Sequence, residues 1–361
     1  MSHTIRKISF WPVIVPLRNY LKSVHGTKNY TERIIIKVET DTNHGWGEIY
    51  GINGIRNMRI YEQKFSNRYI KIDKYIIKHH DYGCLEIDNK INNSCVLGIR
   101  MALLDIEAKD KKIPLYKHLR EKYNTKYNNN NVIKFSSYSY DGNSKEVIKN
   151  LEDGLKIHNH KYLELKLGLR GFNKDIQLVK DVRKHFGGEY KFGVDMNMSY
   201  KYGDAIKFLC SIDNQDINNI EEMCKSLCSI NNFAKVFPKI NFSTHCVNIH
   251  DIYKYHNIHG IVPDPHITDI FNLNSTKNMW LRSCNELGIS FTHMCHLSMA
   301  LDFGRASQSL YNYNKHSLLK EECFNKKDDG IILKNDIIGS GVEIDLKKLY
   351  HYHKKYTNLF I

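Results

Sequence analysis

Short apolar runs alternate with amphipathic stretches from residue 132 onward. The runs that predict strands are VIKFSSYSY, YLELKLG, YKFGVDMN, INNIEEMC, KVFPKINFST, GIVPDP and GISFTHM. A stretch with helical spacing of its apolar residues follows each of them. Strict alternation of strand and helix predicts a parallel sheet with helices packed on it.

The first 120 residues or so follow a different pattern. Two β-branched runs, RKISFWPVIVPL and RIIIKVET, precede the tight Gly45-Trp46-Gly47-Glu48 and predict a small antiparallel sheet. A helical pattern then continues until Pro114 stops it. We therefore expect a first, α+β domain over residues 1–125, a barrel over 132–330, and a C-terminal segment, 331–361, that returns to the first domain. The polar stretch Lys122–Asn131 is the predicted linker.

Polar residues end successive apolar runs about 20–30 residues apart, which is the cadence of a (β/α) barrel with reactive groups at its strand ends. No Gly-rich dinucleotide fingerprint follows the first strand, which argues against a Rossmann fold. The predicted fold class is therefore α/β, a TIM-type barrel with a smaller α+β domain in front of it. The strand-end residues are Lys166, Asp195, Glu221, His245, Asp264 and His293.

Asp195 and Glu221 end consecutive strands, so their carboxylates should meet over one hard cation such as Mg²⁺. His245 is the third candidate ligand and suits Mn²⁺ or another softer divalent cation better. A strand-end acid can instead cap the next helix, and a lone histidine can be a core residue. Zinc is disfavoured because no Cys-x-x-Cys pair is present.

Asp264 and His293 end the next two predicted strands. A carboxylate bonded to one imidazole nitrogen would make His293 a general base near neutral pH, although the pair can also be purely structural. Lys166 is a candidate base from the other side of the barrel. Its same-face neighbour Glu164 would raise the pKa of the lysine, which works against that role.

The composition, 42% hydrophobic and 25% charged over 361 residues, fits a soluble globule of one barrel plus a smaller domain. No apolar run reaches the ~18–20 residues that span a bilayer, so we expect no membrane partner. The net charge of +14 is spread along the chain without a nucleic-acid module, so we expect no nucleic-acid partner. The nine cysteines show no pairing logic, which predicts a reducing cytoplasm.

These motifs resemble the enolase superfamily, and within it the glucarate dehydratase group, over nearly the whole chain. HGTKNYTER, GWGEIYGINGIR and ALLDIEAKDKKIPLYKHL look like that family's capping domain. GIVPDPHITDIF and CNELGISFTHMCH look like the segments that carry its Asp/His dyad, and IIGSGVEIDL resembles its closing segment. The chain departs from the family pattern at Glu164, where the family has a lysine, at His245, where the closest relatives have an asparagine, and at Met294.

The resemblance implies a glucarate dehydratase, a hydro-lyase that removes the α-proton of an aldarate held on Mg²⁺ and then expels the β-hydroxyl. Lys166 or His293 would take the proton, and His293, oriented by Asp264, would assist the leaving group. The family's other site residues correspond to Asn197 in the active site and to His25 and His316 near the substrate. The resemblance also implies a homo-oligomer acting on a small acid sugar. Dehydration or epimerisation of another acid sugar, and a non-catalytic relative, stay open as alternatives.

Overall fold

A computed structural model describes residues 5–23, 26–51, 93–125, 131–212, 216–245, 254–266, 268, 270–272, 278–301, 303 and 305–360. Its N-terminal part is a three-stranded antiparallel sheet, as expected. The strands, in spatial order, are β1 (Ile5–Ser23), β2 (Gly26–Thr40) and β3 (His44–Tyr50).

The central run of β2 is buried on both faces of this sheet. Ile34 and Ile36 pack against α3 (Asn93–Asp110), whereas Ile35 belongs to a cluster on the opposite face. Gly45 and Gly47 allow α3 to lie directly on β3, because a Cβ at either position would come within 2.0 Å of a helix carbonyl. The tight glycine motif is therefore a packing surface for a helix.

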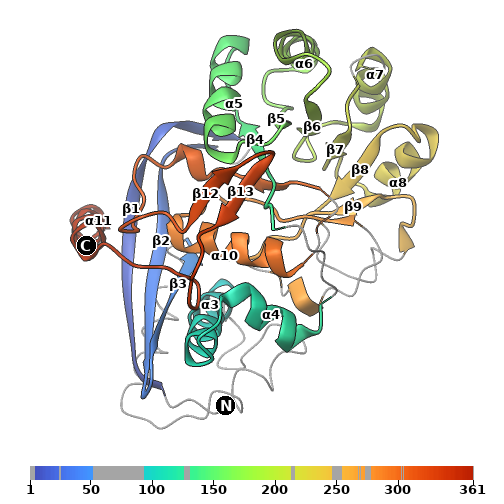
Figure 1. Ribbon diagram of the computed structural model, residues 1–361. Helices are drawn as coiled ribbons and strands as arrows, with labels where there is room; N and C mark the ends of the chain where they lie inside the picture. Colours follow the sequence, from blue (N-terminus) through green and yellow to red (C-terminus); the bar gives the residue numbers. More distant parts are fainter. Residues whose placement is uncertain are drawn as a thin grey trace.

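The second sheet has eight strands, and every pairing in it is parallel (Figure 1). In spatial order the strands are β10 (Asn278–Met279), β9 (Gly260–Ile261), β8 (Asn241–Thr244), β7 (Asn219–Glu221), β6 (Lys191–Asp195), β5 (Tyr162–Lys166), β4 (Phe135–Ser139) and β11 (Ser307–Ser309). The sheet curls, and the backbone N–H of Gln308 in β11 donates to the carbonyl of Leu281, just after β10, at 2.8 Å. This bond joins its two ends, and the expected barrel-type α/β fold is confirmed.

Helices cover the outside of the curled sheet (Figure 1). They are α5 (Ser144–His158), α6 (Phe172–Phe186), α7 (Tyr202–Ile212) and α8 (Leu227–Val236). Their apolar faces and the strands form one continuous core, which includes Phe192, Phe208 and Phe242. Because the β-strands run parallel, all their C-terminal ends open on one side, and that mouth receives the strand-end residues.

The C-terminal part lies against the N-terminal sheet. A hairpin of β12 (Phe324–Lys327) and β13 (Gly330–Leu333) precedes α11 (Leu346–Phe360), which packs on β1 at the left edge of Figure 1. His353 of α11 hydrogen-bonds to the carbonyl of Pro12 at 2.8 Å. The domain boundaries expected from the sequence stay predictions.

One predicted strand is wrong. The run GISFTHM lies in α10 (Gly288–Ala300), a helix that is buried on nearly every side. A helix that is apolar all round has no amphipathic period, so its pattern cannot be told from that of a buried strand. The seventh and eighth barrel strands are instead β10 and β11, two and three residues long. A further helix, α4 (Leu115–Tyr123), begins directly after Pro114.

Candidate active site

Asp195, Glu221 and His245 come together at the mouth of the barrel. Asp195 ends β6, Glu221 ends the neighbouring β7 in register with it, and His245 follows β8. One potential ligand atom from each lies within 4.8 Å of the others. His245 Nε2 is 2.5 Å from Glu221 Oε1. Two carboxylates and an imidazole in this arrangement are a candidate site for a divalent cation.

The two carboxylates are almost completely buried, with 2% of the Asp195 side chain and none of the Glu221 side chain exposed. Burial and the charge of Asp195 raise the pKa of Glu221 to about 8. Burial alone would raise the pKa of Asp195 as well, but Lys166 and His245 lower it to about 2. Burial lowers the pKa of His245 to about 4, which leaves the imidazole neutral near pH 7 and able to bind a metal.

Lys166 lies directly beside this cluster. It ends β5, and its Nζ donates to Asp195 Oδ2 at 2.6 Å. The hydroxyl of Tyr138 donates to the same oxygen at 2.7 Å. The other oxygen of Asp195 accepts from the backbone N–H of Asn197 at 2.9 Å, so the predicted Lys166 and Asn197 both contact the predicted ligand Asp195.

Three further residues support the site and were not predicted. Gln308 of β11 donates from Nε2 to Glu221 Oε2 at 2.8 Å and to Glu164 Oε1 at 3.0 Å. Glu222 accepts from the backbone N–H of His245 at 2.9 Å and so fixes that loop. The third residue is Tyr138, which donates to Asp195. Glu222 and Tyr138 could have been selected from the sequence because both lie next to predicted strand ends. Gln308 gave none, because β11 has only three residues.

Glu164 does not pair with Lys166. Its carboxylate lies deeper in the barrel, where it accepts from Ser136 Oγ at 3.1 Å and from Gln308. Burial and the charge of Glu221 raise the pKa of Glu164 to about 7. The departure from the family pattern at this position therefore adds a buried acid below the cation site.

The expected Asp264–His293 pair is not formed. His293 lies in the middle of α10, and no hydrogen bond or ion pair joins it to Asp264, although the structure describes both residues. The Nδ1 atom of His293 is buried without a partner. Burial, with smaller contributions from neighbouring histidines, lowers the pKa of His293 to about 3. The physical reason is the helix: His293 sits in α10, away from any strand end.

Asp264 has a different partner. It follows β9, and its Oδ2 accepts from the Cys284 thiol at 2.8 Å, while its Oδ1 accepts from the backbone N–H of His266 at 2.8 Å. Arg282 lies near both residues. Burial would lower the pKa of Arg282, but nearby Cys284, Asp264 and Asp195 raise it. No sequence pattern selected Cys284 or Arg282 as a site residue.

Two predicted residues remain, His25 and His316. His25 lies outside the described residues. His316 is on the surface, where its ring lies 6.0 Å from that of Tyr352 in α11. The substrate contact expected for His316 stays a prediction.

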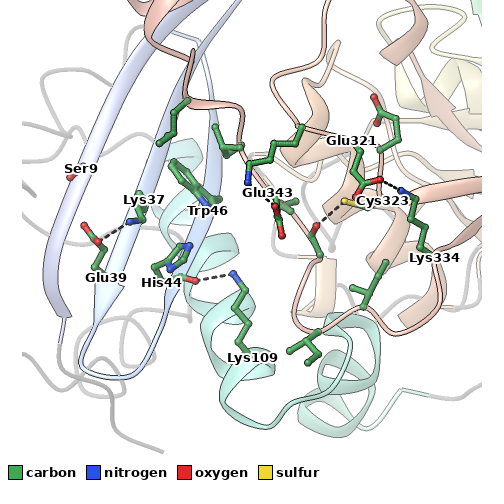
Figure 2. A pocket seen from close by; sticks show the side chains of 18 of the residues that line it. Ser9, Lys37, Glu39, His44, Trp46, Lys109, Glu321, Cys323, Lys334 and Glu343 are labelled. Carbon is green, nitrogen blue, oxygen red and sulfur yellow. Dashed lines mark hydrogen bonds and ion pairs between the residues drawn. The ribbon is translucent and has the colours of Figure 1, made fainter. Parts of the chain in front are cut away.

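Figure 2 shows a different pocket, a cavity of about 880 Å³ between the N-terminal sheet and the C-terminal segment. Trp46 forms part of its wall on the sheet side. Two of its lysines pair with acids: Lys37 with Glu39 at 2.8 Å and Lys334 with Glu321 at 2.6 Å. None of the predicted site residues that the structure describes lines this pocket. Separately, no described helix combines the length and apolarity needed to cross a membrane.

No protein-family model matches the chain. Two curated L-Ala-D/L-Glu epimerases are similar to it. The one from Clostridium acetobutylicum is 26% identical over 220 residues, 59% of each chain. The one from Francisella tularensis subsp. novicida is 25% identical over 213 residues, 57% of each chain. The match thus spans about three fifths of the length of these relatives.

Solved structures match over almost the whole chain. An enolase from Gibberella zeae, complexed with magnesium, formate and sulfate, has a TM-score of 0.83 at 17% identity, covering 99% of this chain and 92% of that one. A dipeptide epimerase from Enterococcus faecalis, complexed with Mg and the dipeptide L-Leu-L-Tyr, has a TM-score of 0.79 at 16% identity, covering 94% and 99%. A muconate lactonizing enzyme from Pseudomonas fluorescens has a TM-score of 0.82 at 15% identity, covering 98% and 100%. The chain therefore has the same fold as these enolase, dipeptide epimerase and muconate lactonizing enzyme structures.

Proposed function

We propose that this chain is a divalent-cation-dependent enzyme that removes and returns the proton on the carbon next to a carboxylate. The substrate class that we propose is a dipeptide such as L-Ala-L-Glu, and the reaction is its epimerisation. One observation carries the proposal: the amine of Lys166 lies 2.6 Å from Asp195, within the same buried cluster that can hold a cation. The curated relatives support the substrate class, because they are named L-Ala-D/L-Glu epimerases.

The donor set fits a divalent cation. Glu221 and Glu164 are buried acids, and the pKa of each is raised by burial and by repulsion from neighbouring carboxylates. A cation held by Asp195, Glu221 and His245 would relieve that repulsion. Magnesium is the first choice, since the similar enolase and dipeptide epimerase structures contain it. The imidazole also suits Mn²⁺. A bound cation supplies positive charge to the substrate carboxylate as the neighbouring proton leaves.

Lys166 is the proton-transfer group on one side of the substrate. Its position at the end of β5 and its contact with Asp195 fix the amine at the mouth of the barrel. In its neutral form the amine takes the α-proton, and in its charged form it returns one. Tyr138, which donates to the same Asp195 oxygen, keeps that carboxylate oriented while Lys166 changes its charge.

Dehydration of glucarate, the reaction first expected, has less support. It requires an acid for the departing hydroxyl, and the residue expected in that role was His293. His293 is buried in α10 and is not bonded to Asp264. Proton exchange without loss of a hydroxyl needs no such acid. The cytoplasmic location and the homo-oligomeric state expected from the sequence stay predictions.

The test is hydrogen–deuterium exchange at the α-carbon of the terminal residue. The purified full chain is incubated in D₂O with MgCl₂ or MnCl₂ and L-Ala-L-Glu or L-Ala-D-Glu, and proton NMR follows both exchange and inversion. Glucarate and other acid sugars are included as competing substrates. We expect exchange and inversion of a dipeptide that EDTA abolishes. Formation of a keto acid from glucarate without dipeptide exchange would refute the proposal in favour of dehydration.

A further inference from the structure

Asp264 and Cys284 form a pair on the side of the barrel opposite Lys166. In the eight-stranded order, β9 lies four strands away from β5, which is half of the sheet. Because the sheet is curled and its two ends are joined, the end of β9 faces the end of β5 across the mouth. Asp264 follows β9 closely, and Cys284 follows β10, the next strand of the sheet.

The pair has a defined geometry. The Sγ of Cys284 lies 2.8 Å from Asp264 Oδ2, which is a short contact for a thiol donor. The other oxygen of Asp264 is fixed by the backbone N–H of His266. The Cys284 backbone N–H in turn donates to Glu286 Oε1 at 2.5 Å. Asp264 is buried, and Cys284 as a whole residue is partly buried.

The N-terminal three-stranded sheet holds the loop that carries Cys284 in place from the other side. Arg33 of β2 donates to the backbone carbonyls of Cys284 and of Asn285, the latter at 2.9 Å. The same arginine pairs with Glu48 of β3 at 3.1 Å, and only 4% of its side chain is exposed. The backbone that carries Cys284 is thus held by a buried ion pair from a separate sheet.

The charge around the thiol also fits proton transfer. Burial and the adjacent Asp264 raise the pKa of Cys284, so the sulfur carries its proton at neutral pH. Arg282 has the opposite effect, because its positive charge favours the thiolate. Arg282 also interacts with Asp195, which connects the thiol pair electrostatically to the cation site. The thiol of Cys284 can therefore give up its proton, because the positive charge of Arg282 stabilises the thiolate that remains.

We infer that Cys284, positioned by Asp264, is the second proton-transfer group and serves the face of the substrate carbon opposite Lys166. This inference rests on the proposed epimerisation. When the C–H bond on the Lys166 face breaks, the proton moves to Nζ and the electron pair stays in the substrate. That electron pair then takes the proton of Cys284: a new C–H bond forms on the opposite face, the S–H bond breaks, and a thiolate remains beside Arg282. The reverse reaction exchanges the two roles, and no oxidant or further reactant is needed.

The experiment compares Cys284→Ala, Cys284→Ser and Asp264→Asn with the wild-type chain, each with MgCl₂ in D₂O. The exposed Cys228 of α8, changed to serine, is the matched control. We expect Cys284→Ala to keep α-proton exchange on the epimer whose proton faces Lys166 and to lose inversion by about 100-fold or more. Asp264→Asn should show the same selective loss, less severely, and Cys228→Ser should match the wild type. Retained exchange on one face proves that the variant is folded.

Two results separate the possible failures. If Cys284→Ala inverts the dipeptide as fast as the wild type, or loses exchange on both faces equally, Cys284 is not the second group although the proposed function stands. If the wild-type chain itself shows no cation-dependent exchange on either epimer, the proposed function fails and this inference fails with it.

Discussion

Replacing Glu48 with leucine tests how much the contact between the N-terminal three-stranded sheet and the barrel mouth stabilises the protein. The Glu48 side chain is fully buried and belongs to β3. Its Oε1 accepts from Arg33 at 3.1 Å and from the backbone N–H of Leu287 at 2.9 Å, and its Oε2 accepts from the N–H of Ser290 at 2.9 Å. The carboxylate therefore neutralises a buried arginine and caps the first turn of α10, where helix N–H groups have no partner inside the helix.

The expected cost of this change is about 4 kcal/mol. Breaking a buried ion pair by removing one partner costs about 3–5 kcal/mol, because the other charge stays buried. The low end applies here, since Arg33 keeps its bonds to the carbonyls of Cys284 and Asn285. Loss of the helix cap adds about 1 kcal/mol. Such a loss is a large part of the roughly 5–15 kcal/mol that stabilises a typical domain.

Urea unfolding followed by circular dichroism measures this free energy. The control is the double variant Arg33→Met/Glu48→Leu, which removes both charges. It should be more stable than Glu48→Leu alone, because apolar residues often replace a buried ion pair without net loss. A loss below about 1 kcal/mol in the single variant, or a double variant no more stable than the single one, would refute the role of the pair.

Three further predictions concern the site. Without a divalent cation, the free energy of unfolding should fall as pH rises from 6.5 to 8. In the folded state the pKa of Glu221 is raised to about 8 and that of Glu164 to about 7, so the folded state binds more protons than the unfolded state over this pH range. Thermal melts should show this slope in the wild type and a weaker one in Glu221→Gln, and equal slopes would contradict it. Lys166→Met should reduce α-proton exchange on one epimer by about 10²–10⁴-fold in the NMR assay, and full activity would exclude Lys166 as a base. His293→Gln should leave kcat for the dipeptide close to the wild-type value in folded protein, since no bond joins His293 to Asp264. A variant that is folded but inactive would show that His293 takes part in the reaction.

The sequence predicted the barrel and the cation cluster for the same physical reason. In a parallel sheet the strand ends share one side, so residues that close consecutive apolar runs, such as Asp195 and Glu221, must lie near each other. The contact between Lys166 and Asp195 follows from the same rule, because β5 and β6 are neighbours in register. Local periodicity was sufficient for these positions.

The partner of Asp264 could not be predicted in this way. The run containing His293 is buried on nearly every side, so its pattern fits a strand as well as a helix. The start of this helix is capped by Glu48, which belongs to another sheet and lies about 240 residues earlier in the chain. Once this run is a helix, the short β10 takes the seventh place in the barrel, and Cys284 takes the position next to Asp264.

The amino-acid order alone therefore determined the alternation of strands and helices, the antiparallel N-terminal sheet and the carboxylates at adjacent strand ends, because each follows from the periodicity of neighbouring residues. Only the tertiary structure decided that Gln308 bridges Glu221 and Glu164, that Arg33 and Glu48 clamp the Cys284 loop, and that a thiol rather than an imidazole meets Asp264. These contacts join segments distant in the chain, and they form when burial forces each polar group to find a partner.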